Sequence, residues 1–320
     1  MRLARCLIIC GSAAVMAGSL ALGGEAAVTS LTAAGPASAG PASTGPASAG
    51  PSSAGPSAAF LAAARTALVR YLDTSHPQIA LVRPGGPARG TARSAGKRAK
   101  PGATTTATAY NWSGYADVSR KTGAFTEVSG QWRTPRVRCG REDEIVSNWV
   151  GLDGFSDSTV EQDGTVSWCF AGTPTYFTWY EMAPAGTVEV GKAVRPGDKI
   201  TARVLRKGTR YTLSLADATR PANGFSVTRT CSLSACNATS AEWICERPAY
   251  PTTGIAPLAR YSTWRLLDAT ETARGVAGTI SSFSPSYRIA MNDSTDSYSL
   301  SAPSAVGGGT AFSTRWRDSY

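Results

Sequence analysis

The sequence predicts an all-β domain over residues 106–320, folded as a two-sheet β-sandwich. Short segments of alternating apolar and polar residues recur throughout this region, such as "GAFTEVSGQW" from Gly123 and "KITARVLRKG" from Lys199. Gly, Pro, Asn and Asp separate these segments every ~8–12 residues, which is typical of short strands joined by turns. The one ambiguous stretch, "RYSTWRLLDATET", has the Thr and Trp content of a strand. The region therefore favours a sandwich over a helical or mixed fold.

The first 27 residues are expected to be a secretory signal peptide. Arg2 and Arg5 form a basic start, a short apolar run follows, and small residues come next around Ala26 and Ala27. A lipid anchor at Cys10 is the alternative. No later segment has about 18 uninterrupted apolar residues, so we expect a secreted protein without a membrane span.

Residues 28–105 resemble a pro-region in their order of segments. Residues 35–58 are a Gly, Pro, Ala and Ser repeat without an apolar face, which predicts a disordered spacer. A helical pattern follows at about residues 58–72, and a basic loop covers residues 83–102. The alternative for the whole segment is a stalk or linker.

Charge divides the chain near residue 105. Residues 1–105 hold ten of the 32 Lys and Arg but two of the 22 Asp and Glu, leaving 22 basic and 20 acidic groups in residues 106–320. The basic balance thus belongs mostly to the part expected to be removed, which argues against a nucleic-acid partner. After the signal peptide the pro-region carries eight basic residues against Asp73. A segment so charged is suited to dock on an acidic groove as an inhibitor.

The cysteines predict two disulfides in the domain. Cys231 and Cys236 can close a small loop, and Cys139 and Cys169 are the natural second pair in an exported protein. Cys245 is left over in an apolar strand pattern, where a free cysteine behaves as a small hydrophobic residue.

The single histidine, His76, lies in the pro-region. The domain can therefore hold neither a Ser-His-Asp triad nor a Cys-His pair nor a histidine-ligated zinc. If it is an enzyme, it works with carboxylates, amides, hydroxyls or lysine, and we expect no metal and no cofactor.

Strand parity places acids beside aromatic residues, because alternate positions share a face. The faces that carry such sets are Trp149 with Asp153, Trp179 with Glu181, and Glu242 with Glu246. A buried carboxylate is costly without a partner. A partly wet groove lined by tryptophans and acids explains the pattern, and a solvated outer face is the alternative.

Five motifs in order resemble the glutamic peptidases, or eqolisins. They are "YNWSGY" (110–115), "NWVGLDG" (148–154), "VEQDG" (160–164), "FTWYEMAP" (177–184) and "AEWICERP" (241–248). The resemblance covers about Tyr110 to the C-terminus. It implies a curved antiparallel sandwich of the concanavalin-like or jelly-roll type, and an endopeptidase made as a precursor, with a substrate groove on the concave face.

The resemblance also assigns residues. It implies a catalytic dyad of Gln162 and Glu246. The positions that it places along the groove as substrate-binding are Trp112, Trp149, Asp153, Trp179 and Glu181. Met182 and Ala183 replace two aromatic residues of the fungal members, and Val166 replaces an aspartate. Arg247 follows the catalytic acid, where a positive neighbour is expected to favour the ionised carboxylate.

The chemistry expected of this dyad suits acidic pH. Glu246 would take a proton from water and pass it to the departing nitrogen, and a carboxyl group works best near its reference pKa of ~4.3. The amide of Gln162 would stabilise the oxyanion. Purely structural roles are the alternatives for two of these residues. Gln162 lies in a turn-like "EQDG", and Asp153 can cap a turn.

Two other functions use the same residue types. A jelly-roll glycoside hydrolase would pair Glu246 with Glu181 or Asp153. A non-catalytic carbohydrate-binding sandwich would stack sugars on the tryptophans. The pro-region favours a peptidase with protein or peptide substrates, and we expect a monomer.

Overall fold

The computed structural model describes most of the predicted domain. The described residues are 104–319 without 141, 156–158, 191–193, 233, 251–253, 284 and 294, together with 57, 59, 60 and 63. Ala59, Phe60 and Ala63 are helical, in agreement with the predicted helix. The signal peptide, the Gly/Pro/Ala/Ser repeat, the basic loop and the rest of that helix lie outside the described residues.

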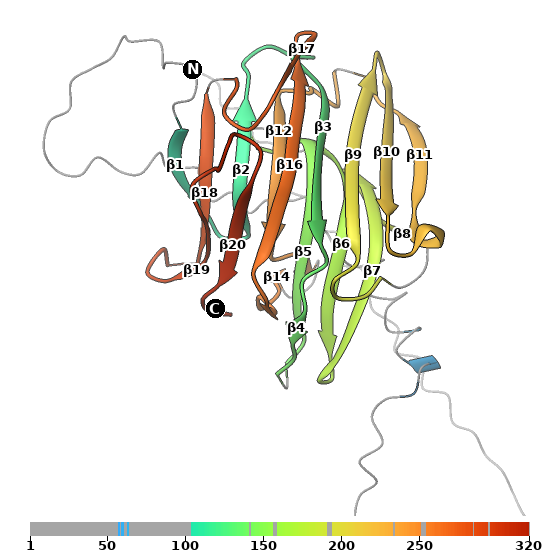
Figure 1. The fold of residues 1–320 in the computed structure, drawn as a ribbon, viewed down its shortest axis with the longest axis vertical. Helices are drawn as coiled ribbons and strands as arrows, with labels where there is room; N and C mark the ends of the chain where they lie inside the picture. Colours follow the sequence, from blue (N-terminus) through green and yellow to red (C-terminus); the bar gives the residue numbers. More distant parts are fainter. Residues whose placement is uncertain are drawn as a thin grey trace, which may run out of the picture. The chain divides into compact units, whose positions relative to one another are not determined.

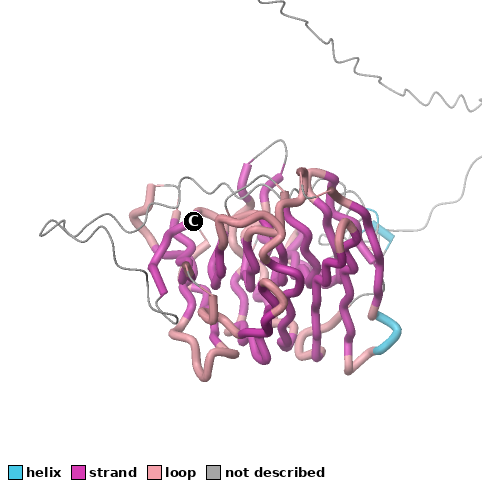
Figure 2. The backbone as a smooth tube through the Cα atoms, turned by 90° about the horizontal axis from the view of Figure 1, so that it is seen from above, coloured by secondary structure: helices cyan, strands magenta, loops and turns pink. Residues whose placement is uncertain are grey.

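The described chain is an antiparallel β-sandwich of two layers, as predicted, with a single short 3₁₀ helix within residues 104–319, η1 (Pro221–Asn223). The front layer in Figure 1 contains, in hydrogen-bonding order, β11 (Phe225–Thr230), β10 (Arg210–Asp217), β9 (Lys199–Lys207), β3 (Phe125–Arg133), β16 (Trp264–Ala273) and β20 (Phe312–Trp316). The second layer contains β19 (Ser299–Pro303), β18 (Ser286–Asn292), β2 (Trp112–Val118), β12 (Ser240–Glu246), β5 (Glu144–Asp153), β6 (Val160–Phe170), β7 (Thr173–Met182) and β8 (Ala185–Val190). Figure 2 shows how little of the described backbone is helical.

Short strands complete the fold. β1 (Thr104–Ala109) runs parallel to β18, and β17 (Val276–Gly278) pairs with β16. Two ribbons are formed by β4 (Val137–Arg138) with β15 (Arg260–Tyr261), and by β13 (Ala249–Tyr250) with β14 (Gly254–Ile255). β1 therefore begins slightly ahead of the predicted domain start at residue 106.

The two layers are joined on one side and open on the other. Backbone hydrogen bonds run from β16 through β20 and β19 to β18, so the sheet folds over on itself there. At the other side β11 and β8 end the path, and the layers stay separate. Between the layers, β3 faces β5 and β12, and β9 and β10 face β6.

A large apolar core fills the space between the layers. Trp132 and Trp264 from the front layer and Trp243 from β12 are almost fully buried in it. Cys245 lies in the same core as a free, buried thiol, and burial raises its pKa to about 11. Along β12, Trp243 and Cys245 face the core while Ile244 belongs to a second cluster on the opposite face, as strand alternation requires.

Both predicted disulfides are present. Cys139 and Cys169 tie the segment after β4 to the end of β6, and Cys231 and Cys236 close a loop after β11. Among the described residues, no helix is long and apolar enough to cross a membrane.

Candidate active site

The second layer carries a distinct face on the side turned away from the intersheet core, which we call the tryptophan face. Its indole rings come from β2, β5, β6 and β7, and are those of Trp112, Trp149, Trp168 and Trp179. Strand alternation puts Gln162, Glu181 and Glu246 on the same face. The face thus brings together the acids, amide and tryptophans that the sequence motifs predicted.

The side chains of this face are fully enclosed, whereas a partly wet groove was expected. Trp149, Gln162, Glu181 and Glu246 are each 0% exposed.

Glu246 is held by two hydrogen bonds at the end of β12. Nε1 of Trp149 donates to its Oε2 over 2.7 Å, and Nδ2 of Asn111 donates to its Oε1 over 3.3 Å. Donors aimed at both oxygens favour the ionised carboxylate in a place where an unpartnered charge would be costly. Asn111 was not predicted as a site residue, although it stands next to Trp112 in "YNWSGY".

Arg247 does not play the part expected of it. Its Nη1 donates to the backbone oxygen of Ser319 over 3.4 Å, and Asp293 is the acid that acts on its charge. Burial lowers the pKa of its guanidinium to about 10. Because successive side chains of an extended chain point to opposite sides, the guanidinium is directed to the C-terminal segment and away from the Glu246 carboxylate.

Gln162 is paired with Glu181 across a hairpin. Its Nε2 donates to Oε2 of Glu181 over 2.7 Å, and the Thr187 hydroxyl donates to Oε1 of the same carboxylate over 3.2 Å. Glu181, predicted to bind substrate, thus orients the Gln162 amide. Thr187 was missed by the sequence analysis, because its place depends on the pairing of β7 with β8.

The pairing of Gln162 with Glu181 was within reach of the sequence. Ala171 and Gly172 form the two-residue turn between β6 and β7, both with positive φ, which is the type favoured in tight hairpins. A two-residue turn at this point fixes the register, and counting back from it puts Gln162 opposite Glu181.

Trp149 lies between the two candidate catalytic residues. Its Nε1 reaches Glu246, while a Cβ added at Gly151 would lie 2.9 Å from its Cζ3 and 3.2 Å from Cβ of Gln162. The indole therefore spans β5 from the carboxylate towards the amide. Gly164 is required beneath it, since a Cβ there would come within 2.2 Å of the Asn148 carbonyl oxygen. In the intact chain Gln162 and Glu246 share this face with separate partners, Glu181 for the first and Trp149 for the second.

Trp112 and Trp179 present hydrogen-bond donors on the same face. The Trp112 ring meets Trp149 edge to face, with ring centroids 5.0 Å apart. Within the described part of the chain, Nε1 of both Trp112 and Trp179 is buried without a hydrogen-bond partner. Buried indole N–H groups normally find an acceptor, so these two are suited to a bound ligand.

Asp153 has contacts that favour the turn-capping alternative. Its carboxylate accepts hydrogen bonds from the backbone N–H groups of Ala238 and Thr239 at 2.6 and 2.7 Å, and from the Thr239 hydroxyl. Its own φ of 70° is one that Asp tolerates in turns. Asp153 thus fastens the loop before β12, the strand that carries Glu246.

No metal site emerges from the described residues, where no three His, Cys, Asp or Glu side chains are grouped to hold an ion. The site offers carboxylates, amides and indole donors. This inventory suits proton transfer to and from water together with stabilisation of a developing oxyanion.

Comparisons with known proteins agree with this site. A family model described as the Peptidase A4 family matches residues 110–310. Scytalido-glutamic peptidase with a transition state analog inhibitor is 22% identical with a TM-score of 0.56, over 65% of this chain and 98% of that one. SCP-B, a member of the eqolisin family in complex with the tripeptide Ala-Ile-His, is 21% identical with a TM-score of 0.52 over the same shares. No curated protein matches.

The sandwich and the family match define a hydrolase of the glutamic peptidase class. The chain belongs to the Peptidase A4 family, since the match spans more than half of its length. The predicted resemblance is therefore confirmed.

Proposed function

We propose that this peptidase is a secreted endopeptidase acting at acidic pH, with Glu246 as general base and acid and Gln162 as oxyanion donor. The observation that carries the proposal is the pair of hydrogen bonds from Trp149 and Asn111 to Glu246. They favour the ionised form, and a general base must be ionised to accept a proton. Family membership supplies the peptide bond as substrate.

Glu246 would act on water first and on the leaving group second. Its carboxylate takes a proton from the attacking water as the new C–O bond forms at the scissile carbonyl. The resulting carboxyl group then donates that proton to the nitrogen as the C–N bond breaks, which restores the carboxylate. No histidine is needed, consistent with a domain that has none.

Gln162 would stabilise the negative oxygen of the tetrahedral intermediate. Its Nε2 carries two hydrogens, and Glu181 accepts one of them in the intact chain. The second can point to the substrate oxygen while Glu181 keeps the amide group from rotating. Because an amide does not titrate, this donor is retained at low pH.

The indoles would hold the peptide along the face. The unpartnered Nε1 groups of Trp112 and Trp179 suit the backbone carbonyls of an extended chain. Sugar hydroxyls would suit the same donors, but the glycoside hydrolase and sugar-binding alternatives lose support from the peptidase family match.

Single substitutions test the dyad on an unfolded protein substrate at pH 3–5. We expect Glu246→Gln to abolish cleavage and Gln162→Ala to lower kcat by roughly 10²–10³, the usual effect of removing one oxyanion donor. Glu242→Gln, on the same strand and face as Glu246, and Gln131→Ala, on exposed β3 surface, are the matched controls. Full activity in either dyad variant would overturn the assignment, and reducing-sugar release from polysaccharides would revive the alternative.

The pro-region is proposed to cover the tryptophan face until it is removed. The excess of basic residues in 28–105 supports this. The ring of Phe60 also lies 5.6 Å from that of Phe170, at the end of β6. The signal-like first 27 residues support export, and the monomeric state is a further part of the proposal.

Self-removal of the pro-region has its own test. In a host without other proteases, the Glu246→Gln chain should accumulate at full length while the wild type is trimmed near residue 105. Trimmed Glu246→Gln protein would show that the trimming is not self-cleavage by Glu246, without affecting the proposed role of the dyad in cleaving substrates.

A further inference from the structure

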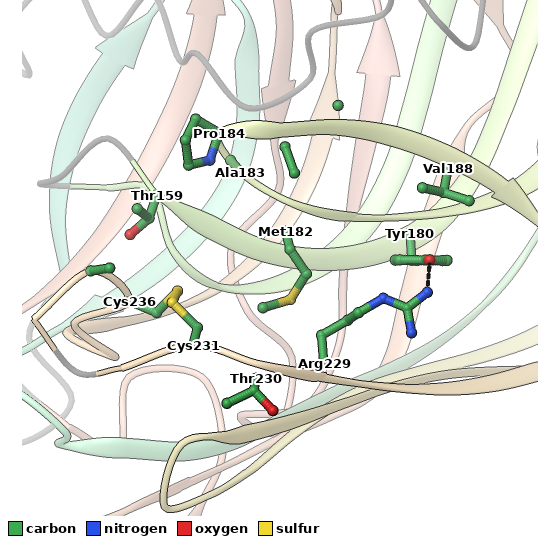
Figure 3. A pocket seen from close by; sticks show the side chains of 13 residues that line it. Thr159, Tyr180, Met182, Ala183, Pro184, Val188, Arg229, Thr230, Cys231 and Cys236 are labelled. Carbon is green, nitrogen blue, oxygen red and sulfur yellow. Dashed lines mark hydrogen bonds between the residues drawn. A yellow bond between two sulfur atoms is a disulfide. The ribbon is translucent and has the colours of Figure 1, made fainter.

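A pocket of about 410 Å³ opens at the unjoined side of the sandwich, between the edge strands β8 and β11. Its walls are mostly apolar, formed by Met182, Pro184, Val188 and the Cys231–Cys236 disulfide (Figure 3). This volume is within the range of small-ligand sites. A hydrophobic group of the size of one amino-acid side chain fits it.

The pocket is separate from the tryptophan face. Tyr180 and Met182 line it from β7, and both pack against the intersheet core. Trp179, directly before Tyr180 in sequence, packs in the cluster of the opposite face. The strand β7 therefore serves two sites, one on each side of the sheet.

The guanidinium group of Arg229 lies at the pocket and is held there by hydrogen bonds. Nη2 of Arg229 donates a hydrogen bond to the Tyr180 hydroxyl, and its Nη1 donates to the backbone oxygen of Thr228 over 3.0 Å. Its guanidinium carbon lies 5.0 Å from the centroid of the Tyr180 ring. Figure 3 shows the guanidinium group joined to the Tyr180 hydroxyl, with Met182 and Val188 near them.

Arg229 and Tyr180 together carry more hydrogen-bond donors than the described residues around them accept. A guanidinium has five N–H groups, and two of Arg229's are used by Tyr180 and Thr228. Among the described residues no carboxylate makes an ion pair with Arg229; the pairs found involve Arg203 and Arg220. The buried Tyr180 hydroxyl accepts from Arg229, which leaves its own proton to donate. Arg229 and Tyr180, which contact each other at the pocket, therefore both keep N–H or O–H donors beyond those that the described residues use.

We propose that this pocket binds the C-terminal residue of a peptide, with an apolar side chain among Met182, Pro184 and Val188. The terminal carboxylate would pair with Arg229 and the Tyr180 hydroxyl, because guanidinium groups bind carboxylates through two N–H donors. The outer edges of β8 and β11, which no other described strand pairs, offer backbone groups to the rest of an extended peptide. An alkyl carboxylate shares the acid but cannot use those edges.

The test is isothermal titration of the purified protein at pH 6.5, where the ligand acid is ionised. The probes are N-acetyl-leucine, N-acetyl-leucinamide and octanoate, none of which has a peptide bond between two residues. We expect N-acetyl-leucine to bind at least about tenfold more tightly than its amide, because hydrogen bonds between charged partners are roughly twice as strong as neutral ones. Octanoate should bind more weakly than N-acetyl-leucine.

Two variants test whether Arg229 binds the carboxylate of the ligand, and a third serves as their control. Arg229→Gln should lower the affinity for N-acetyl-leucine to the affinity for N-acetyl-leucinamide. Val188→Glu should do the same, because Val188 pairs with Tyr180 across the β7–β8 ladder and a carboxylate there would occupy Arg229. Arg265→Gln, an exposed arginine on β16, should leave both affinities unchanged.

Equal binding of acid and amide to the wild type would overturn the proposal, as would unchanged acid binding in Arg229→Gln. Tighter binding of octanoate than of N-acetyl-leucine would assign the pocket to alkyl carboxylates instead. Each result is independent of catalysis on the tryptophan face, because no probe is cleaved.

Discussion

The indole N–H of Trp149 donates a hydrogen bond of 2.7 Å to the carboxylate of Glu246, from the strand next to it in the sheet. Trp149→Phe keeps the ring and removes this donor. We expect kcat/KM to fall at least about tenfold, since a hydrogen bond to a charged group contributes ~1.5–3 kcal/mol. We also expect the acid limb of the pH–rate profile to move to higher pH, because the ionised carboxylate loses a partner.

Trp168→Phe is the matched control for this experiment. Trp168 lies on the same face, at 2% exposure, and its ring packs on Phe170, whereas the described donors to Glu246 are Trp149 and Asn111. Equal pH profiles for Trp149→Phe and the wild type would show that the bond has no catalytic role.

Glu181 is expected to act as a positioning residue for Gln162. Glu181→Ala frees the Gln162 amide to rotate, so kcat should fall about tenfold or more while KM changes less, as expected when an interaction of the transition state is weakened. Glu181→Gln keeps an acceptor and should restore part of the loss. A change confined to KM, or no rescue by Gln, would instead make Glu181 a substrate-binding or purely structural residue.

Gly151 is the point where Trp149 and Gln162 approach the same backbone position. Gly151→Ala adds a Cβ only 2.9 Å from the Trp149 ring, so the ring must shift. We expect a loss of activity and a destabilisation of about 1–3 kcal/mol, the usual range for overpacking. Gly307→Ala, whose nearest neighbour would be 3.8 Å away, serves as the control in urea titrations. A Gly151→Ala enzyme as stable and active as the control would mean that the ring moves freely.

The burial of Asp117 and Glu271 leads us to expect a fold that is more stable at acidic than at neutral pH. Both are almost fully buried, and burial, followed by the negative charge of Asp117, raises the pKa of Glu271 well above its usual value. A group with a raised folded-state pKa contributes full stability below its unfolded pKa and loses it as pH rises. The unfolding free energy should therefore decline from about pH 4.5 upwards, by up to ~1.4 kcal/mol per pH unit from this one group.

Glu271→Gln removes this dependence because the amide mimics the protonated acid. Its stability relative to the wild type should be greater at pH 7.5 than at pH 4, as measured by urea unfolding followed through tryptophan fluorescence. An identical difference at both pH values would show that Glu271 titrates normally in the folded protein.

The alternation of residues along single strands was enough to predict much of the fold and to predict which residues lie on the tryptophan face. Strand parity was enough to put Glu242 and Glu246 on one face, because alternation along one strand needs no tertiary information. The same alternation put Trp179 and Glu181 together. The two-residue turn at Ala171 and Gly172 was also enough to predict that Gln162 pairs with Glu181, although the sequence analysis did not use it.

Other features depend on residues far apart in the chain. Asp153 fastens Thr239, 86 residues later, and Arg247 reaches Ser319, 72 residues later. No periodicity links such positions, so a turn cap and a groove acid look alike in sequence. The assumed effect of Arg247 on Glu246 was wrong for this reason, since neighbours in an extended strand point to opposite sides.

The central claim is that Glu246 activates water. The most direct measurement is kcat/KM on an unfolded protein substrate from pH 2 to 8, for the wild type and for Glu246→Gln prepared identically. We predict a wild-type maximum at acidic pH and a loss of at least about 10²-fold in the variant across that range, the contribution typical of a general base. A Glu246→Gln enzyme with the wild-type rate and profile would contradict the account.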